Sequence, residues 1–425
     1  EYLEQDEGGR GVSNPAPLPC LQDACAGYRR IGVAVSGGSD SVAALVLAVE
    51  GLGAQAVQAV TVDHGLRPEA AQEAAQVAAL CARLGVAHDT LKWEGPREGN
   101  LQQAARQARL DLIGAWARGR VEAVVLAHTR DDQAETFLMR LARGSGVDGL
   151  SGMAPRRIAR GMTWLRPFLP VTRDELRDAL RGRGIGWADD PSNADPAFLR
   201  VRARQALSQL AALGIDSATL ADTTARLRRA RIALDLQMMD AVSRLGREET
   251  GTVLIARAAL DLPAEIRDRL FAALLMALSG DGYRPRLTAL HRWLAQGGAL
   301  RGCVLADEGD DLRLWREARA IAAVETPADM LWDRRWRANI PAGAPPGAVI
   351  RALGSDGLAR LSAQARAGEH PHWRETGLPQ AALAAQPAIW HGTELIAAPL
   401  ALWPQKWRFS ARPVAAMVNE LQQSH

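Results

Sequence analysis

Short apolar runs rich in β-branched residues alternate with helical stretches between residues 29 and 130, and this alternation constrains the fold most. The expected strands are 31–35, 56–62, 87–93 and 121–127, and the expected helices between them are 40–50, 69–84 and 101–117. Strands that alternate with helices of this length form a parallel sheet covered on both faces. The sequence therefore predicts an α/β fold with a doubly wound parallel sheet. Ligands of such sheets bind beyond the carboxyl ends of the strands.

The first of these strand ends carries a glycine- and serine-rich loop. It reads Ser36, Gly37, Gly38, Ser39, Asp40 and Ser41, and it opens the following helix. Glycines let the backbone approach phosphate oxygens, and the N–H groups at a helix start face an anion. The loop has no lysine, so it is not the Walker loop, and its aspartate suits an anion site if Mg²⁺ bridges it to phosphates. We predict a pyrophosphate-binding loop; the alternative is an ordinary turn in which the aspartate caps the helix.

Polar residues also follow the second expected strand. Asp63 and His64 open the segment DHGLR, which ends at Arg67. A carboxylate and an imidazole at this position suit the base or sugar of a nucleotide. The alternative is a polar turn in which Asp63 caps the next helix.

The fourth expected strand is followed by His128 and by a pair of carboxylates, Asp132 and Glu135. The two carboxylates are three residues apart and therefore share one face of the helix that they begin. They suit Mg²⁺ or an ammonium group. The structural alternative is that the carboxylates are present because acidic residues favour the first turn of a helix, and that the histidine is a core residue. Because three strand ends converge, we favour a functional site.

Five segments together carry a resemblance to a known family. They are SGGSDS (36–41), DHGLR (63–67), AHTRDDQAET (127–136), ARGSGVDGLSGM (142–153) and LRP (165–167). With them the chain resembles the tRNA(Ile)-lysidine synthase family of the PP-loop (N-type) ATP pyrophosphatase superfamily. The resemblance is strong over residues 30–205 and diffuse in the last hundred residues. It implies a PP-loop ATPase fold of the adenine-nucleotide-hydrolase type.

The resemblance also implies a reaction. The C2 oxygen of the wobble cytidine in a CAU anticodon of tRNA(Ile) is adenylated by ATP, and free L-lysine then displaces AMP to give lysidine. ATP and Mg²⁺ are the implied cofactors, tRNA(Ile) and L-lysine are the implied partners, and a homodimer is suggested.

By position, the resemblance implies roles for particular residues. Asp40 and Asp132 would serve catalysis and Mg²⁺ binding, and the loop 36–41 with Asp63 and His64 would bind ATP. The residues expected at the lysine site are His128, Asp132, Glu135 and Arg106.

Arg106 and Arg109 match the family's ARxxR helix, although they are equally well explained as solvated helix arginines. Two positions depart from the family pattern: Leu110 replaces a tyrosine, and Val201 replaces an asparagine. Both departures concern the fine positioning of RNA more than the activity.

Arginines are dense after residue 139. Residues 140–183 contain ten arginines and four acidic residues, a local excess of six (10 − 4), although the net charge of the chain is only +3. Such a basic surface beside an ATP site is expected for binding an RNA backbone, and the alternative is a solvated face. The residues predicted to contact tRNA are Arg143, Arg166, Arg200, Arg202 and Arg204.

A chain of 425 residues is longer than a domain with a single hydrophobic core usually is, so we expect several domains. We predict a leader (1–28), the catalytic domain (29–215), a small α-rich tRNA-binding domain (216–325) with a terminal hairpin, and a mixed α/β domain for tRNA recognition (326–425). The acidic start does not resemble a signal peptide, and the longest apolar run, Val42 to Val49, is too short to span a membrane. We therefore expect a cytoplasmic protein without membrane partners, whose cysteines are reduced.

There are two alternatives to the leading prediction, one within the same enzyme superfamily and one of a different class. Another PP-loop enzyme, such as a tRNA thiolase or an amide-forming ligase, would require a cysteine or an additional catalytic domain near the crevice. The four cysteines (Cys20, Cys25, Cys81 and Cys303) have no C-x-x-C or zinc spacing and are not expected there. A non-catalytic RNA-binding protein with a vestigial nucleotide fold is disfavoured by the intact loop and carboxylates.

Overall fold

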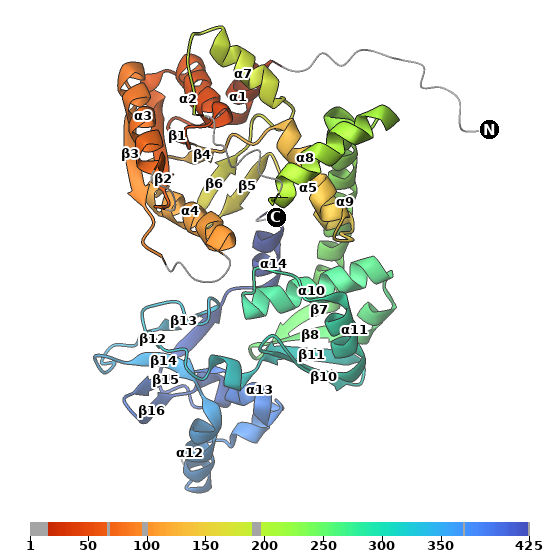
Figure 1. The fold of residues 1–425 in the computed structure, drawn as a ribbon. Helices are drawn as coiled ribbons and strands as arrows, with labels where there is room; N and C mark the ends of the chain where they lie inside the picture. The colour runs from red at the N-terminus through yellow and green to blue at the C-terminus, as the bar shows by residue number, and fades with distance from the viewer. Residues whose placement is uncertain (1–15, 66–68, 96–100, 189–196, 369, 424–425) are drawn as a thin grey trace, which may run out of the picture. The chain divides into compact units, whose positions relative to one another are not determined.

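The computed structural model describes residues 16–65, 69–95, 101–188, 197–368 and 370–423. The chain divides into two compact units between Arg231 and Ile232 (Figure 1). Residues 1–15 of the expected leader lie outside the described residues. Pro17–Cys25 form helix α1, in which Leu21 and Cys25 are buried in the core of the first unit. The predicted division at residues 28, 215 and 325 stays a prediction.

A six-stranded sheet forms the centre of the first unit, in the order β3-β2-β1-β4-β6-β5. Its strands are β1 (Ile31–Ala34), β2 (Val57–Asp63), β3 (Ala87–Lys92), β4 (Ala123–Val125), β5 (Arg156–Ala159) and β6 (Met162–Leu165). Ile31 is paired with Val57 on one side and with Ala123 on the other, and both pairings are parallel. Only the edge hairpin β5–β6 is antiparallel.

Helices cover both faces of this sheet (Figure 1). The helices are α2 (Ser39–Leu52), α3 (Glu69–Leu84), α4 (Leu101–Ala117) and α7 (Arg173–Arg181), besides α1. Residues of α1, α2, α3 and α7 share one apolar core with Val33 and Val125. Ile113 and Trp116 of α4 pack on the opposite face against Ala34 and Val124. The doubly wound parallel sheet is therefore confirmed, and the elements expected in residues 29–130 are found to within two residues at each end.

A second group of helices in this unit packs around Phe137 and Leu220 rather than on the sheet. It contains α5 (Arg130–Leu141), α6 (Val147–Leu150), α8 (Leu199–Leu210) and the first part of α9 (Ser217–Leu245). Helix α5 starts only a few residues after β4, so the acidic residues of its first turns lie at the carboxyl edge of the sheet.

The second unit begins with a five-stranded antiparallel sheet, in the order β7-β8-β11-β10-β9. Its elements are β7 (Gly246–Glu249), β8 (Thr252–Ala256), α10 (Ala264–Ser279), α11 (Leu287–Gln296), β9 (Gly298–Leu300), β10 (Cys303–Glu308) and β11 (Asp311–Arg316). The sequence predicted helices here and only the β10–β11 hairpin. The additional strands have three to five residues, and periodicity alone does not distinguish such short apolar runs from pieces of helix.

The remaining residues form two small antiparallel sheets with helices, as expected for a mixed α/β region. One sheet has the order β12-β14-β15-β16, and the other pairs β13 with β17. The elements are β12 (Thr326–Pro327), β13 (Trp336–Asn339), β14 (Val349–Ala352), α12 (Gly354–Arg366), α13 (Gln380–Ala384), β15 (Pro387–His391), β16 (Glu394–Ala397), β17 (Arg408–Ala411) and α14 (Val414–Gln423). Buried tryptophans, among them Trp332 and Trp336, form one of its cores.

Among the described residues, no helix combines the length and apolar character needed to cross a membrane.

Candidate active site

The loop after β1 is closed by its own serine hydroxyls. The Ser36 N–H donates to Ser41 Oγ (3.0 Å), and Ser41 Oγ donates to the Gly38 carbonyl (3.0 Å). Gly37 has a φ of +90°, where a residue with a Cβ would be strained. Gly38 is the N-cap of α2 and, lacking a side chain, leaves the first N–H groups of the helix to an anion.

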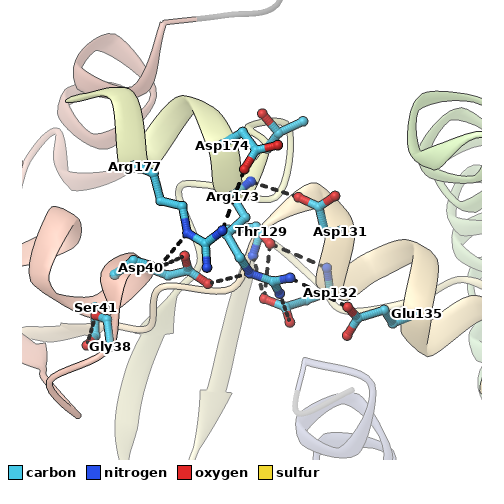
Figure 2. Close-up of polar contacts among 12 residues, drawn as sticks. Gly38, Asp40, Ser41, Thr129, Asp131, Asp132, Glu135, Arg173, Asp174 and Arg177 are labelled. Carbon is cyan, nitrogen blue, oxygen red and sulfur yellow. Dashed lines mark hydrogen bonds and ion pairs between the residues drawn. The ribbon is translucent and has the colours of Figure 1, made fainter. Parts of the chain in front are cut away.

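Three carboxylates, one from α2 and two from α5, surround the guanidinium of Arg173, and Figure 2 shows this cluster. Arg173 Nε lies 3.2 Å from Asp40 Oδ2, and Nη2 lies 3.3 Å from Asp132 Oδ1. Nη1 lies 3.7 Å from Glu135 Oε1. The structure thus brings together three of the four acidic residues that the sequence singled out; the fourth, Asp63, is not among the described partners of Arg173.

Asp132 is held by the start of its own helix. Thr129 is the N-cap of α5, and its N–H donates to Asp132 Oδ2 (2.9 Å) while the Asp132 N–H donates to Thr129 Oγ1 (3.4 Å). This reciprocal capping box satisfies two backbone donors and fixes the side-chain rotamer. Because one carboxylate oxygen is used in the cap, the other points toward Arg173.

Glu135 lies one turn further along α5 and is fully buried. Besides Arg173, it is contacted by two arginines of α8: Arg204 Nε lies 2.8 Å from Oε1, and Arg200 Nε lies 3.2 Å from Oε2. A buried carboxylate needs such partners, because an unpaired charge out of water is costly. Glu135 therefore connects α5, α7 and α8.

The environments of these carboxyl groups differ. Burial raises the pKa of Asp40, against the attraction of Arg173. Burial also raises the pKa of Glu135, against the neighbouring arginines. Burial acts in the same direction on Asp132, but His128, a backbone N–H and the arginines outweigh it, so the pKa of Asp132 is lowered. The pKa of Asp132 is lowered because His128 and the Thr129 backbone N–H add to the arginines, whereas burial dominates at Asp40 and Glu135.

The end of β2 presents the predicted nucleotide residues. Asp63 Oδ1 accepts the Gly65 N–H (2.8 Å) and so shapes the turn. His64 meets Trp93 edge to face at 5.9 Å between ring centroids. Burial, and next the nearby Arg109, lower the pKa of His64. A neutral imidazole beside an indole suits the base or sugar of a nucleotide.

Helix α4 and the two departures from the family pattern are accommodated in the first unit. The side chain of Arg106 and all of Arg67 lie outside the described part of the chain. Leu110 packs against the apolar core under α4. Val201 is buried in α8. Leu110 therefore has apolar surroundings, and Val201 is shielded from water.

The glycine-rich segment after α5 is fixed by side chains around it. Gln133 donates to the Met153 carbonyl (3.0 Å) and accepts the Met153 N–H (2.7 Å). Arg140 donates to the Gly149 carbonyl (2.6 Å). Gly152 has a φ of +68°, and a Cβ there would lie 2.4 Å from a methyl group of Thr224. Only glycine fits at this position.

The arginines predicted to contact tRNA fall into three groups. Arg143 and Arg202 are exposed. Arg200 and Arg204 are partly exposed but pair with Glu135. Arg166 is only 9% exposed and donates to the Ala154 carbonyl (2.8 Å). The count of arginines in this region therefore overstates the charge that is free to meet an RNA backbone.

Sequence reasoning did not single out Arg173 or Arg177, which lie one turn apart on α7. Arg177 Nε is 3.4 Å from Ser39 Oγ in the loop after β1. One signal was available in the sequence. An arginine at the first position of a helix opposes the helix dipole, so its presence beside the capping residue Thr172 suggests acidic partners outside the helix.

The residues present fit a divalent cation. Asp40 and Asp132 direct carboxylate oxygens at one positively charged group, and such oxygens are the ligands that Mg²⁺ prefers. Within the described ranges, no cluster of three or more His, Cys, Asp or Glu side chains could hold a metal. The fit is therefore to an ion held by two carboxylates and completed by phosphates and water.

Comparison with known proteins agrees with this geometry. Residues 18–211 match the family model of the PP-loop domain. The sheet, the loop and this match define the chain as a PP-loop enzyme that uses ATP.

Similarity to individual proteins extends beyond this domain. The chain is 46% identical over 389 residues to the tRNA(Ile)-lysidine synthase of Ruegeria pomeroyi, covering 89% of this chain and 90% of the relative. It is 36% identical over 404 residues to that of Mesorhizobium japonicum, covering 90% and 87%. With that of Rhodopseudomonas palustris the identity is 44% over 286 residues, covering 64% and 82%. The chain belongs to the tRNA(Ile)-lysidine synthase family.

Proposed function

We propose that this enzyme joins L-lysine to C2 of the wobble cytidine in the CAU anticodon of tRNA(Ile), with conversion of ATP to AMP and pyrophosphate. The observation that carries the proposal is the meeting of Asp40, Asp132 and Glu135 beside the phosphate loop. A site with phosphate-binding N–H groups on one side and carboxylates on the other suits both ATP and an amine substrate. Family membership supplies the identity of the nucleic acid.

The first step is adenylation. The C2 oxygen of cytidine attacks the α-phosphorus of ATP, and the bond to the departing pyrophosphate breaks. The backbone N–H groups at the start of α2 and the hydroxyls of Ser36 and Ser39 stabilise the negative charge on that leaving group, while Ser41 holds the shape of the loop through its bond to the Gly38 carbonyl. Asp40 and Asp132 would hold Mg²⁺, which supplies further neutralisation of phosphate charge.

The second step is attack of the lysine ε-amine on C2, with release of AMP. Only the neutral amine attacks, so a group near it must take a proton. We assign this role to the acidic pair Asp132 and Glu135 with His128 beside it, because burial raises the pKa of Glu135 and so favours its taking a proton. Asp132 and Glu135, together with Arg106, would bind lysine; its ammonium group would take the place of the Arg173 guanidinium among the carboxylates.

We assign tRNA contacts to the arginines Arg143, Arg200, Arg202 and Arg204, with Arg166 supporting the segment between them. Recognition of the tRNA body is assigned to residues 216–425. The similarity to tRNA(Ile)-lysidine synthases, which covers 89% of this chain and so extends beyond residue 215, supports this assignment. The homodimer and the cytoplasmic location stay predictions.

A tRNA thiolase is disfavoured by the cysteines. Burial raises the pKa of Cys25, Cys81 and Cys303 to about 11 in each case. Burial also raises the pKa of Cys20. Sulfur transfer requires a thiolate, and these thiols stay protonated near neutral pH.

The test is a reconstituted reaction with ATP, Mg²⁺, labelled lysine and a tRNA(Ile) transcript with a CAU anticodon. We expect lysine-labelled tRNA and an equal amount of AMP. Asp40→Ala should abolish AMP formation, whereas the exposed Asp178→Ala on α7 should retain it. Absence of lysine from the tRNA, with sulfur incorporated or with no product at all, would refute the assignment. Normal turnover of Asp40→Ala would refute the metal role.

A further inference from the structure

Helix α7 turns two arginines toward the phosphate loop, and neither belongs to the sequence motifs of the site (Figure 2). We propose that Arg173 and Arg177 bind the β,γ-phosphate end of ATP and the pyrophosphate that leaves. They would supply the cationic side chains that the loop itself lacks. This inference deepens the proposed function and rests on it for the use of ATP at this loop.

The phosphate loop has no positively charged side chain of its own to bind the triphosphate. None of the six residues 36–41 is basic, and one of them, Asp40, is acidic. The triphosphate of ATP carries several negative charges, which phosphate loops of the Walker type meet with a lysine. Here a comparable side chain has to come from another element. Helix α7 is packed against α2, which the loop opens.

Helix α7 is anchored firmly enough to present side chains in a fixed direction. Thr172 and Glu175 form a capping box at its start, with the Glu175 carboxylate accepting the Thr172 N–H (2.7 Å). Asp131 of α5 accepts the Arg173 N–H (2.7 Å). Residues four apart lie on the same face of a helix, so Arg173 and Arg177 point in the same direction. That face is turned to Ser39 and Asp40 of the loop.

The present partners of the two arginines are compatible with exchange for phosphate. Arg177 makes one long hydrogen bond, 3.4 Å to Ser39, and a 3.7 Å ion pair with Asp174, whose side chain is 84% exposed. Exposed pairs of this kind contribute little to stability. Arg173 neutralises Asp40 and Asp132, and a cation that binds these two carboxylates competes for the same oxygens. The released guanidinium then has phosphate oxygens at the adjoining loop as its partners, and guanidinium groups bind phosphate in a bidentate way.

The competing explanation is structural: both arginines only attach α7 to α2 and α5. The two explanations differ in ligand dependence. A phosphate-binding role affects ligands that carry β- and γ-phosphates and leaves AMP unaffected. A structural role affects ATP and AMP equally, together with the unfolding temperature.

The experiment measures binding of ATP with Mg²⁺, of pyrophosphate with Mg²⁺ and of AMP to the full chain by calorimetry, without tRNA or lysine. Arg177→Ala is the principal variant because Arg177 has weak contacts, and Arg177→Lys retains the charge. Arg181→Ala is the matched control, since Arg181 lies one turn further on α7, pairs with the exposed Asp178 and lies 5.9 Å from the centroid of the Trp187 ring; among the described residues its partners do not include the loop 36–41. Thermal unfolding of each variant reports any loss of structure.

We expect Arg177→Ala to weaken ATP and pyrophosphate binding about 10-fold or more, as for loss of a charged hydrogen bond. AMP binding and the unfolding temperature should stay as in the unsubstituted chain, Arg177→Lys should recover part of the loss, and Arg181→Ala should change nothing. Arg173→Ala should show the same contrast between ATP and AMP. Equal losses for ATP and AMP, or unchanged ATP binding, would overturn the inference.

The outcomes separate this inference from the proposed function. If the contrast holds but no lysine enters tRNA, the pyrophosphate contacts stand and the lysidine assignment fails. If lysidine forms and Arg177→Ala binds ATP normally, the assignment stands and the inference fails.

Discussion

Gly152 allows the sharpest prediction of stability, because the chain offers a matched control eight residues away. Gly152 and Gly144 lie in the same glycine-rich segment, with φ of +68° and +70°. Alanine at either position carries the cost of a left-handed backbone, about 1–2 kcal/mol. A Cβ at Gly144 meets nothing within 4 Å. A Cβ at Gly152 would lie 2.4 Å from Thr224 and 2.7 Å from Gln133 Oε1.

The difference between the variants is therefore the cost of the overlap. Overpacking in a rigid region costs roughly 1–3 kcal/mol. Displacing Gln133 also weakens its two hydrogen bonds to Met153, each worth about 1 kcal/mol. If one of these is lost, Gly152→Ala is destabilised by about 2–4 kcal/mol more than Gly144→Ala. For a unit of this size that is a further decrease in Tm of about 4–16 °C.

The assay is thermal unfolding of the full chain with and without ATP and Mg²⁺. The transition that moves upward with ATP belongs to the unit that binds it, because a ligand stabilises the state to which it binds. Gly152→Ala should lower that transition much more than Gly144→Ala. Equal shifts would show that the segment adapts to the added methyl group and that the contact of Gly152 with Thr224 and Gln133 is not restrictive.

Further predictions concern charge. Glu135→Gln keeps the shape of the side chain but removes the negative charge between Arg200 and Arg204. We expect the free energy of unfolding to fall by about 1–3 kcal/mol, which is less than for a fully buried ion pair because both arginines are partly exposed. An unchanged unfolding temperature would contradict this expectation. Arg202→Ala should weaken tRNA binding in filter-binding titrations. The magnitude of the slope of the logarithm of the binding constant against the logarithm of the salt concentration should decrease by about one, as for the loss of one phosphate contact. Arg166→Ala should instead lower the unfolding temperature, because Arg166 is buried and donates to a backbone carbonyl. If Arg166→Ala weakened tRNA binding and Arg202→Ala lowered the unfolding temperature, Arg166 would be the RNA contact and Arg202 the structural residue.

The sheet and the position of the site could be predicted because both depend on local patterns. Apolar runs of strand length between amphipathic helices specify a parallel sheet, and topology alone places the ends of β1, β2 and β4 at one edge. The acidic residues on α5 followed from their spacing. The family motifs strengthened these predictions without changing them.

The packing around those residues could not be predicted from local patterns. Arg173 and Asp40 are 133 positions apart, and nothing in either neighbourhood specifies their contact. Counting charge in residues 140–183 gave a basic surface, yet Arg166 is buried and Arg183 pairs with Glu50. The sign of the charge on a side chain can be read from the sequence, whereas the partner of that charge depends on the tertiary structure.

Charge balance explains why these partners occur. Asp40, Asp132 and Glu135 lie together beside the phosphate loop, and cations of the protein itself must neutralise their largely buried negative charge when no ligand is bound. Arg173 does so for all three carboxylates, while Arg200 and Arg204 share Glu135 with it. Any cation that displaces Arg173 therefore also changes the electrostatic environment of the α8 arginines. One connected network thus contains five of the residues predicted to meet ATP, lysine or RNA, and in it Glu135 joins the nucleotide side to the arginine-rich side; the five are Asp40, Asp132, Glu135, Arg200 and Arg204.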